Sequence, residues 1–145
     1  MSSVAVIGCG IVGLTSAIRL LEAGFKVTVL TKDLAQDTTS AVAAAMWHPG
    51  GAGDEPLKHW CQKSLEVFKN LSKDEHSGVR MIPAYELSDH EFVDQGLELA
   101  DDLSLLMVSP FPEPWNYGYR FNTAQINTPT YMPFVLNRFE TLGGI

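Results

Sequence analysis

Patterns that mark several common catalytic sites are missing from this 145-residue chain. Its four histidines lack the H-E-x-x-H spacing of zinc peptidases, and its two distant cysteines give no zinc pattern. It contains no G-x-S-x-G elbow and no Walker loop, because Gly-Lys-Ser/Thr does not occur. The sequence therefore predicts neither a metal site nor a hydrolase nucleophile.

Positive charge is also scarce, since ten Lys and Arg stand against seventeen Asp and Glu and the formal net charge is −7. This balance disfavours nucleic acid and anionic membrane surfaces as partners. No apolar run approaches the roughly 18 residues that a membrane span needs, and we expect no secretory signal. Cys9 and Cys61 are the only cysteines. We expect both to be reduced and the protein to be intracellular.

The most informative pattern lies at residues 4–14, in a chain that is 46% hydrophobic and long enough for about one domain. Val4–Ile7 predicts a buried strand. Three glycines in G-x-G-x-x-G spacing follow within Gly8, Cys9, Gly10, Ile11, Val12 and Gly13. In such a loop the first glycine allows a tight turn, the second lets backbone approach a pyrophosphate, and the third lets helix and strand pack closely. The pattern predicts dinucleotide binding at a helix N-terminus; the alternative is a glycine turn that only joins two packed elements.

The following residues complete a βαβ unit. Apolar residues at helical spacing predict a helix that Gly24 ends, and Lys26–Leu30 predicts a second buried strand. A carboxylate commonly binds the ribose at the end of this strand, where the chain instead has Thr31, Lys32 and Asp33. Three interpretations stay open. Asp33 reaches the ribose if the loop turns back, Lys32 favours the 2′-phosphate of NADP, or both are solvated loop charges.

A hydroxyl-rich stretch, Asp37–Ser40, then leads into an alanine run at residues 41–45. The hydroxyls could cap a short helix and donate to phosphate oxygens. The alanines could let a planar ring lie close to backbone. An ordinary packed helix explains the same composition, and the residues alone leave both interpretations open.

Beyond residue 52 the spacing of apolar residues predicts alternating helices and strands. We expect a helix over 55–71, strands over 79–87 and 117–123, and a final helix with Thr128 as N-cap, Pro129 as first residue and Gly143 as its stop. The first of these helices has an apolar stripe that predicts a core face, at Leu57, Trp60, Cys61, Ser64, Leu65, Phe68 and Leu71. A further short helix is expected from the spacing of Leu97, Ala100, Leu103, Leu106 and Met107.

Three stretches, in this order, resemble the N-terminal half of the D-amino acid oxidase family of flavoproteins, which includes D-aspartate oxidase. They are GCGIVG at 8–13, VTVLTKDLAQD at 27–37 and TTSAVAAAMWHP at 38–49. That family pairs the glycine loop with a Thr-rich stretch, Val-Ala-Ala, two further residues and Trp-x-Pro, and the segment at 129–143 is similar to its Pro-x-Tyr-to-Leu-Gly segment. Thr31 departs from relatives that have Asp there, and Ala45 departs from the frequent Gly.

The resemblance implies an α/β fold, with a Rossmann-like FAD-binding βαβ domain at residues 1–51 and part of an α+β substrate domain with a return helix at 52–145. By position it implies that FAD contacts the glycine-loop residues named above, Thr31–Asp33, and the hydroxyl residues Thr38, Thr39 and Ser40. The resemblance places the flavin ring beside Ala44, Ala45 and Met46. His48 falls where some relatives have a polar residue near the active site. The family's substrate-binding Arg and Tyr lie in its later half, and no residue of this chain corresponds to them. No catalytic residue is therefore assigned.

The activity that the resemblance implies is oxidative deamination of a D-amino acid to a 2-oxo acid, with release of ammonia and hydrogen peroxide. The alternatives are a glycine or sarcosine oxidase, an NAD(P)-dependent dehydrogenase, and a non-catalytic dinucleotide-binding fragment. We expect the chain to be the N-terminal part of a longer protein, because only two strands of the cofactor domain are visible. A homodimer is one expected assembly. The expected location is the cytoplasm or, in a eukaryote, the peroxisome.

Overall fold

The computed structural model describes residues 2–51, 53–91, 96–106 and 110–145. These residues form two compact units, which are described separately. Unit 1 contains the N-terminal residues through Ala45, together with Glu75–Gly78 and Ile126–Ile145. Unit 2 contains Met46–Asp74 and Val79–Gln125. The chain therefore leaves unit 1 after residue 45, returns briefly at Glu75–Gly78, and returns again with its last twenty residues.

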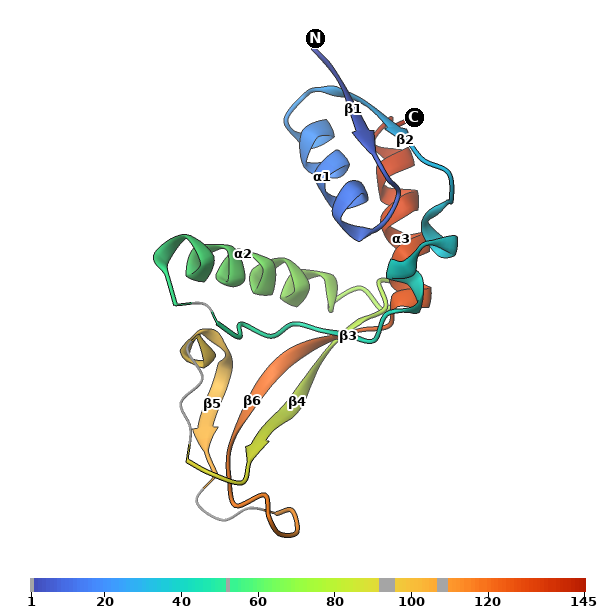
Figure 1. Ribbon diagram of the computed structural model, residues 1–145. Helices are drawn as coiled ribbons and strands as arrows, with labels where there is room; N and C mark the ends of the chain where they lie inside the picture. Colours follow the sequence, from blue (N-terminus) through green and yellow to red (C-terminus); the bar gives the residue numbers. More distant parts are fainter. Residues whose placement is uncertain (1, 52, 92–95, 107–109) are drawn as a thin grey trace. The chain divides into compact units, whose positions relative to one another are not determined.

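Unit 1 is built on two parallel strands joined by a helix (Figure 1). These are β1 (Ser3–Ile7), α1 (Ile11–Glu22) and β2 (Lys26–Leu30). The strands pair in register from Ser3 opposite Lys26 to Ile7 opposite Leu30. This arrangement confirms the predicted Rossmann-like βαβ unit. The expected burial of its two strands is wrong, because no residue of β1 is buried and Val27 is the one buried residue of β2.

The amphipathic pattern of α1 determines how the helix packs. Its buried residues are Leu14, Ala17 and Ile18, three and four positions apart, which places them on one face. The helix ends as the sequence predicts, since Gly24 has a φ of 86°. The N–H of Gly24 donates to the Leu21 carbonyl and that of Phe25 to the Leu20 carbonyl, so two carbonyls at the end of α1 have partners.

The last helix of the chain, α3 (Thr128–Thr141), packs against α1 within unit 1. Its core face consists of Tyr131, Met132, Val135 and Phe139. The expected N-cap is wrong by one residue, because Asn127 precedes the helix and Thr128 is its first residue. The Thr128 hydroxyl contacts carbonyls elsewhere in unit 1 instead of capping its own helix. Two short 3-10 turns, η1 (Ala35–Asp37) and η2 (Thr39–Val42), also lie against α3.

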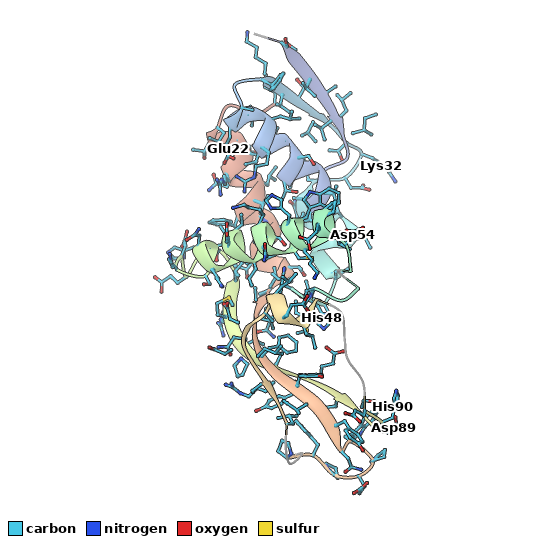
Figure 2. All side chains as sticks on the ribbon, turned by 90° about the vertical axis from the view of Figure 1, so that its left-hand side faces the viewer. Glu22, Lys32, His48, Asp54, Asp89 and His90 are labelled. Atoms are coloured by element: carbon cyan, nitrogen blue, oxygen red, sulfur yellow. The ribbon has the colours of Figure 1, made fainter. Side chains whose placement is uncertain are left out.

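Unit 2 combines a long helix with an antiparallel arrangement of strands (Figure 1). Helix α2 (Glu55–Leu71) is preceded by the N-cap Asp54, whose carboxylate accepts a hydrogen bond from the Leu57 N–H at 2.9 Å; Figure 2 labels this aspartate. The sheet has the order β3-β6-β4, and a further strand, β5, pairs with β6. Its strands are β3 (Ala45–Met46), β4 (Val79–Ser88), β5 (Asp101–Leu105) and β6 (Tyr117–Ile126).

Two expectations for unit 2 are wrong. The segment expected as a helix at 97–107 is a short 3-10 turn, η3 (Leu97–Leu99), followed by strand β5; Met107 lies outside the described residues. Leu97 and Ala100 are buried as a helix would bury them, but pairing with β6 overrides the helical spacing beyond residue 100. The apolar stripe of α2 is also not entirely core, because Leu57 is exposed and Trp60 is 65% exposed.

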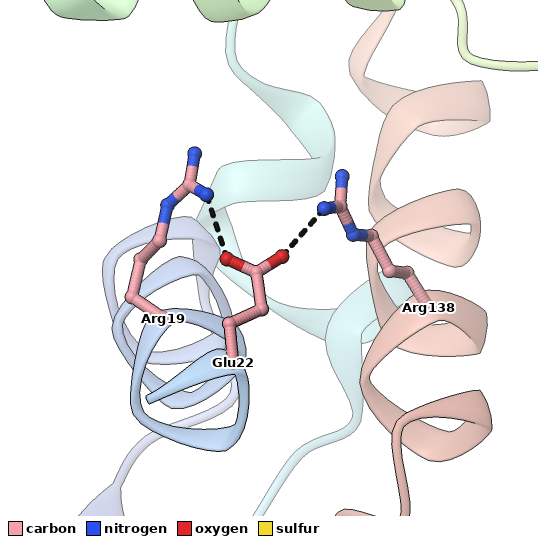
Figure 3. Close-up of polar contacts among 3 residues, drawn as sticks. All are labelled: Arg19, Glu22 and Arg138. Carbon is pink, nitrogen blue, oxygen red and sulfur yellow. Dashed lines mark hydrogen bonds and ion pairs between the residues drawn. The ribbon is translucent and has the colours of Figure 1, made fainter. Parts of the chain in front are cut away.

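A carboxylate shared by two arginines joins α1 to α3 (Figure 3). Glu22 accepts from Arg19 at 2.7 Å and from Arg138 at 2.6 Å. The hydrogen bond from Arg19, followed by that from Arg138, holds the pKa of Glu22 below its ordinary value. All three side chains are partly exposed, so solvent screens the interaction.

We predict that Glu22→Gln lowers the free energy of unfolding by about 0.5 kcal/mol at neutral pH. A carboxyl whose pKa falls on folding stabilises the folded state at pH above its unfolded pKa, about 4.3, and this contribution disappears as the pH falls through the lower, folded pKa. The difference between wild type and variant in urea unfolding should therefore vanish in acid. Glu66→Gln, which breaks an exposed pair with Lys63 on one helix, is the control; an equal effect there would contradict a specific role for the helix-joining pair.

Candidate dinucleotide site

The glycine loop lies directly after the carboxyl end of β1, where ligands bind in folds with parallel strands. Gly8 has a φ of 102°, and its N–H donates to the Leu30 carbonyl at 2.9 Å, which fixes the turn to the end of β2. A Cβ at Gly13 would lie 2.0 Å from the Gly8 carbonyl oxygen. Gly8 thus makes the tight turn and Gly13 the close approach that the sequence predicts.

The N-terminus of α1 carries unused hydrogen-bond donors. Gly10 is the N-cap and has no side chain to offer, and the first turn contains no acidic residue. The Ile11 N–H donates to the Ser40 hydroxyl at 3.1 Å. Among the described residues no hydrogen-bond acceptor meets the N–H of Val12 or of Gly13. Free amides at the positive end of a helix dipole are suited to binding an anion such as a diphosphate, so this helix end stays the predicted position for one.

The remaining loop residue, Cys9, points its side chain into the protein. Its thiol is free and only 3% of the residue is exposed. Burial raises the pKa of this thiol, while a hydrogen bond with the Ala35 backbone lowers it and the charge of Glu140 raises it. The thiol is therefore protonated at neutral pH. Cys9 is left with its backbone alone for contact with a ligand.

At the end of β2 the chain turns back on itself. The Thr31 hydroxyl donates to the Asp33 carbonyl at 2.7 Å, which closes a short turn around Lys32. All three residues are exposed, and Figure 2 labels Lys32. For Asp33 to reach a ribose the loop would have to turn back, and the structure shows a local bend here. The contact itself, and the choice between Asp33 and Lys32, stay predictions.

The hydroxyl-rich stretch forms the two turns η1 and η2 rather than one capped helix. Thr38 is the N-cap of η2, but its hydroxyl donates to the Ala35 carbonyl at 2.8 Å and does not cap. Thr39 is exposed, and Ser40 lies at the N-terminus of α1 through its bond with Ile11. The structure therefore brings Ser40 to the glycine loop, although the two are 29 residues apart in sequence.

The alanine run lies in unit 1, and the residue that follows it, Met46, begins unit 2. Ala44 is exposed and Ala45 half-buried in unit 1, whereas Met46 is exposed in unit 2. Ala45 and Met46 form strand β3, which pairs with β6. That these residues border a flavin ring stays a prediction.

Apolar side chains at the carboxyl ends of the strands were not expected as site residues. Ile7 ends β1 and is 88% exposed, and Leu30 ends β2 and is 55% exposed. Val12 in the first turn of α1 and Val42 in η2 are 75% and 82% exposed. Exposed aliphatic groups beside free amides are suited to a ligand with a flat apolar ring system. For Ile7 and Leu30 the available sequence signal was their position at the last residue of a predicted strand, whereas Val12 was already expected to contact FAD as part of the glycine loop.

His48, which Figure 2 labels, belongs to unit 2, and both of its ring nitrogens have hydrogen-bond partners. The Gly50 N–H donates to Nδ1 at 3.0 Å, so the proton of the neutral ring lies on Nε2, 2.9 Å from a Glu86 carboxylate oxygen. The imidazole also meets the Phe121 ring edge-on, with centroids 5.8 Å apart. These contacts connect the segment after β3 with β4 and β6.

Within the described residues no three or more His, Cys, Asp and Glu side chains gather closely enough to hold a metal ion. No helix in this part of the chain combines the length and apolarity that crossing a membrane requires.

Comparison with known families shows the family to which the chain belongs. Residues 3–145 match the DAO family model, described as FAD dependent oxidoreductase. The chain belongs to this family. The family is FAD dependent. Three features of the site fit FAD: the free amides, the exposed apolar side chains, and the lack of a side chain at Gly10.

Curated relatives carry the names of amino acid oxidases. The chain is 34% identical over 142 residues to a D-amino-acid oxidase of Rubrobacter xylanophilus, covering 96% of this chain and 44% of the relative. It is 26% identical over 155 residues to the human D-aspartate oxidase, covering 97% and 45%. The chain therefore spans less than half the length of these relatives.

Solved structures show the same fold. A glycine oxidase from Bacillus cereus matches with a TM-score of 0.68 at 19% identity, covering 99% of this chain and 45% of that chain. An L-amino acid deaminase from Proteus vulgaris matches with a TM-score of 0.76 at 12% identity, covering 97% and 42%.

We predict that Gly13→Ala destabilises the protein by about 1–3 kcal/mol, because its Cβ must displace backbone at Gly8. Gly10→Ala is the matched control, since its Cβ meets only the Ser40 hydroxyl at 3.1 Å, which is a side-chain atom that can shift. Urea unfolding followed by circular dichroism measures both variants. Equal losses of stability would show that the close approach at Gly13 is not what fixes the loop.

Proposed function

We propose that this chain forms the FAD-binding portion of an enzyme that oxidatively deaminates D-amino acids. The products are a 2-oxo acid, ammonia and hydrogen peroxide. The match to the FAD-dependent family and the names of the curated relatives support the reaction class. The substrate class rests on those relatives alone.

The observation that carries the proposal is the N-terminus of α1. The free amides of Val12 and Gly13 and the hydroxyl of Ser40 converge beside a loop with no side chain at Gly10. Such an arrangement binds the diphosphate of a dinucleotide through backbone donors and the helix dipole. The chemistry that FAD supplies when bound is acceptance of a hydride from the Cα of the amino acid.

The part played by this chain's own residues is binding and orientation. Gly8 and Gly13 fix the loop, and Ser40 adds a hydroxyl beside the helix N-terminus. Exposed Ile7, Leu30 and Val42 offer apolar contact to ring systems. No general acid or base among the described residues is required by this role. The proposed substrate contacts are not assigned to any residue here.

We predict that Gly10→Val abolishes FAD retention while the fold persists. A branched side chain would occupy the path along which a diphosphate approaches the backbone, and Gly10 has ordinary extended dihedral angles that valine can adopt. Flavin absorbance of the purified chain, after incubation with FAD and desalting, measures retention, and circular dichroism checks folding. Ser16→Val, on the exposed side of α1, is the control. Unchanged flavin occupancy in Gly10→Val would contradict the proposed site.

We predict that the FAD-loaded protein from its natural source releases hydrogen peroxide with D-alanine or D-aspartate and not with glycine or sarcosine. A coupled peroxidase assay compares these four substrates and the L-enantiomers of the first two. Release from glycine or sarcosine alone would favour the amine-oxidase alternative. Bound flavin without peroxide from any substrate would indicate a non-catalytic binding protein, and binding of NADP in place of FAD would overturn the cofactor assignment.

A further inference from the structure

The Thr128 hydroxyl, near the end of the chain, contacts the end of η2, which belongs to the segment that we propose borders FAD. It lies 3.0 Å from the Ala41 carbonyl oxygen and 2.8 Å from that of Ala43. Thr128 is only 7% exposed, and Ala41 is also buried. Both carbonyls lie at the end of η2, where a helical turn has no internal partner left for its C=O groups. The single proton of Thr128 is therefore shared between two carbonyls for which the described residues supply no other donor.

The same turn carries the residue that meets the glycine loop. Ser40 immediately precedes Ala41, and its hydroxyl accepts the Ile11 N–H at the start of α1. Thr128 thus holds η2 from one side, and Ser40 contacts the helix N-terminus on the other. All of these residues belong to unit 1. The contacts run without interruption from α3 to the anion-binding end of α1.

We infer that Thr128 is a positioning residue for the dinucleotide site. By pairing the carbonyls at the end of η2, it keeps Ser40 against the N-terminus of α1. A hydroxyl that accepts from Ile11 still has its own proton to donate. No described residue accepts that proton, so Ser40 can offer it to a phosphate oxygen. The site is then arranged before the ligand arrives, and less ordering entropy is lost on binding.

This inference deepens the proposed FAD site and rests on it. It concerns a residue that touches no cofactor, so activity alone cannot test it. Two readouts are needed: FAD affinity, and the exchange rate of the Ile11 amide in the protein without ligand. The second depends on the contact between Ser40 and Ile11 and requires no flavin.

The experiment uses the 145-residue chain and removes the hydroxyl by Thr128→Val or, without a β-branch, by Thr128→Ala. We expect the Kd for FAD, measured by quenching of flavin fluorescence, to rise about tenfold, equivalent to about 1.4 kcal/mol. NMR-detected hydrogen exchange at Ile11 should accelerate, while exchange at Val6 in β1 should not. Thr128→Ser keeps a hydroxyl and should restore both values to within about twofold.

Two controls separate positioning from general destabilisation. Thr141→Val removes a hydroxyl at the other end of α3, where it donates to the Asn137 side chain, and should leave affinity and exchange unchanged. Ser40→Ala should weaken FAD binding by itself. If Thr128 acts through Ser40, the double variant should lose little more affinity than the weaker-binding of the two single variants.

Several results would overturn the inference. An unchanged Kd for FAD in Thr128→Val and Thr128→Ala would do so, as would acceleration of exchange at Val6 equal to that at Ile11. Fully additive losses in the double variant would show that Thr128 does not act through Ser40. A wild-type chain that binds no FAD would instead overturn the proposed function, and the inference with it.

Discussion

The close approach of Gly13 to the Gly8 carbonyl sets where α1 begins, and the candidate site depends on that position. Any side chain at residue 13 would push the helix away from the loop. With the helix in place, the amides of Val12 and Gly13 are left without acceptors at the end of β1. The site therefore consists chiefly of backbone, held in position by the absence of two side chains. Substitution elsewhere in the loop would change its shape less than substitution at these glycines.

The site is completed by a segment that is distant in sequence. Unit 1 takes its last helix from residues 128–141, after the chain has passed through all of unit 2. That helix packs on α1, binds Glu22 through Arg138, and contacts the end of η2 through Thr128. A short parallel pair of strands with one helix would leave much of its apolar surface exposed. The returning helix covers part of it and holds the hydroxyl-rich turn against the glycine loop.

Sequence reasoning succeeded where a pattern has a local physical cause. The glycine spacing, the apolar face of α1 and the glycine that ends it each depend on residues within about one turn of one another. It failed at residues 97–107, because a spacing of three to four apolar residues also fits a turn followed by an edge strand. Pairing with β6, which no local pattern reveals, decided between them. It also misplaced the role of Thr128, since a threonine before a proline is a typical N-cap, whereas the true acceptors lie 85 and 87 residues away.

The sequence by itself determined the βαβ unit, the glycine loop and the family resemblance, because each is recorded in neighbouring residues. The match to the FAD-dependent family confirms the last of these. Only the tertiary structure decided that Ser40 meets Ile11, that Thr128 closes η2, and that Ile7, Leu30 and Val42 are exposed near the loop. Hydrogen bonds and burial between segments tens of residues apart depend on how the chain folds back. The local spacing of residues does not determine how the chain folds back, so it cannot predict these contacts.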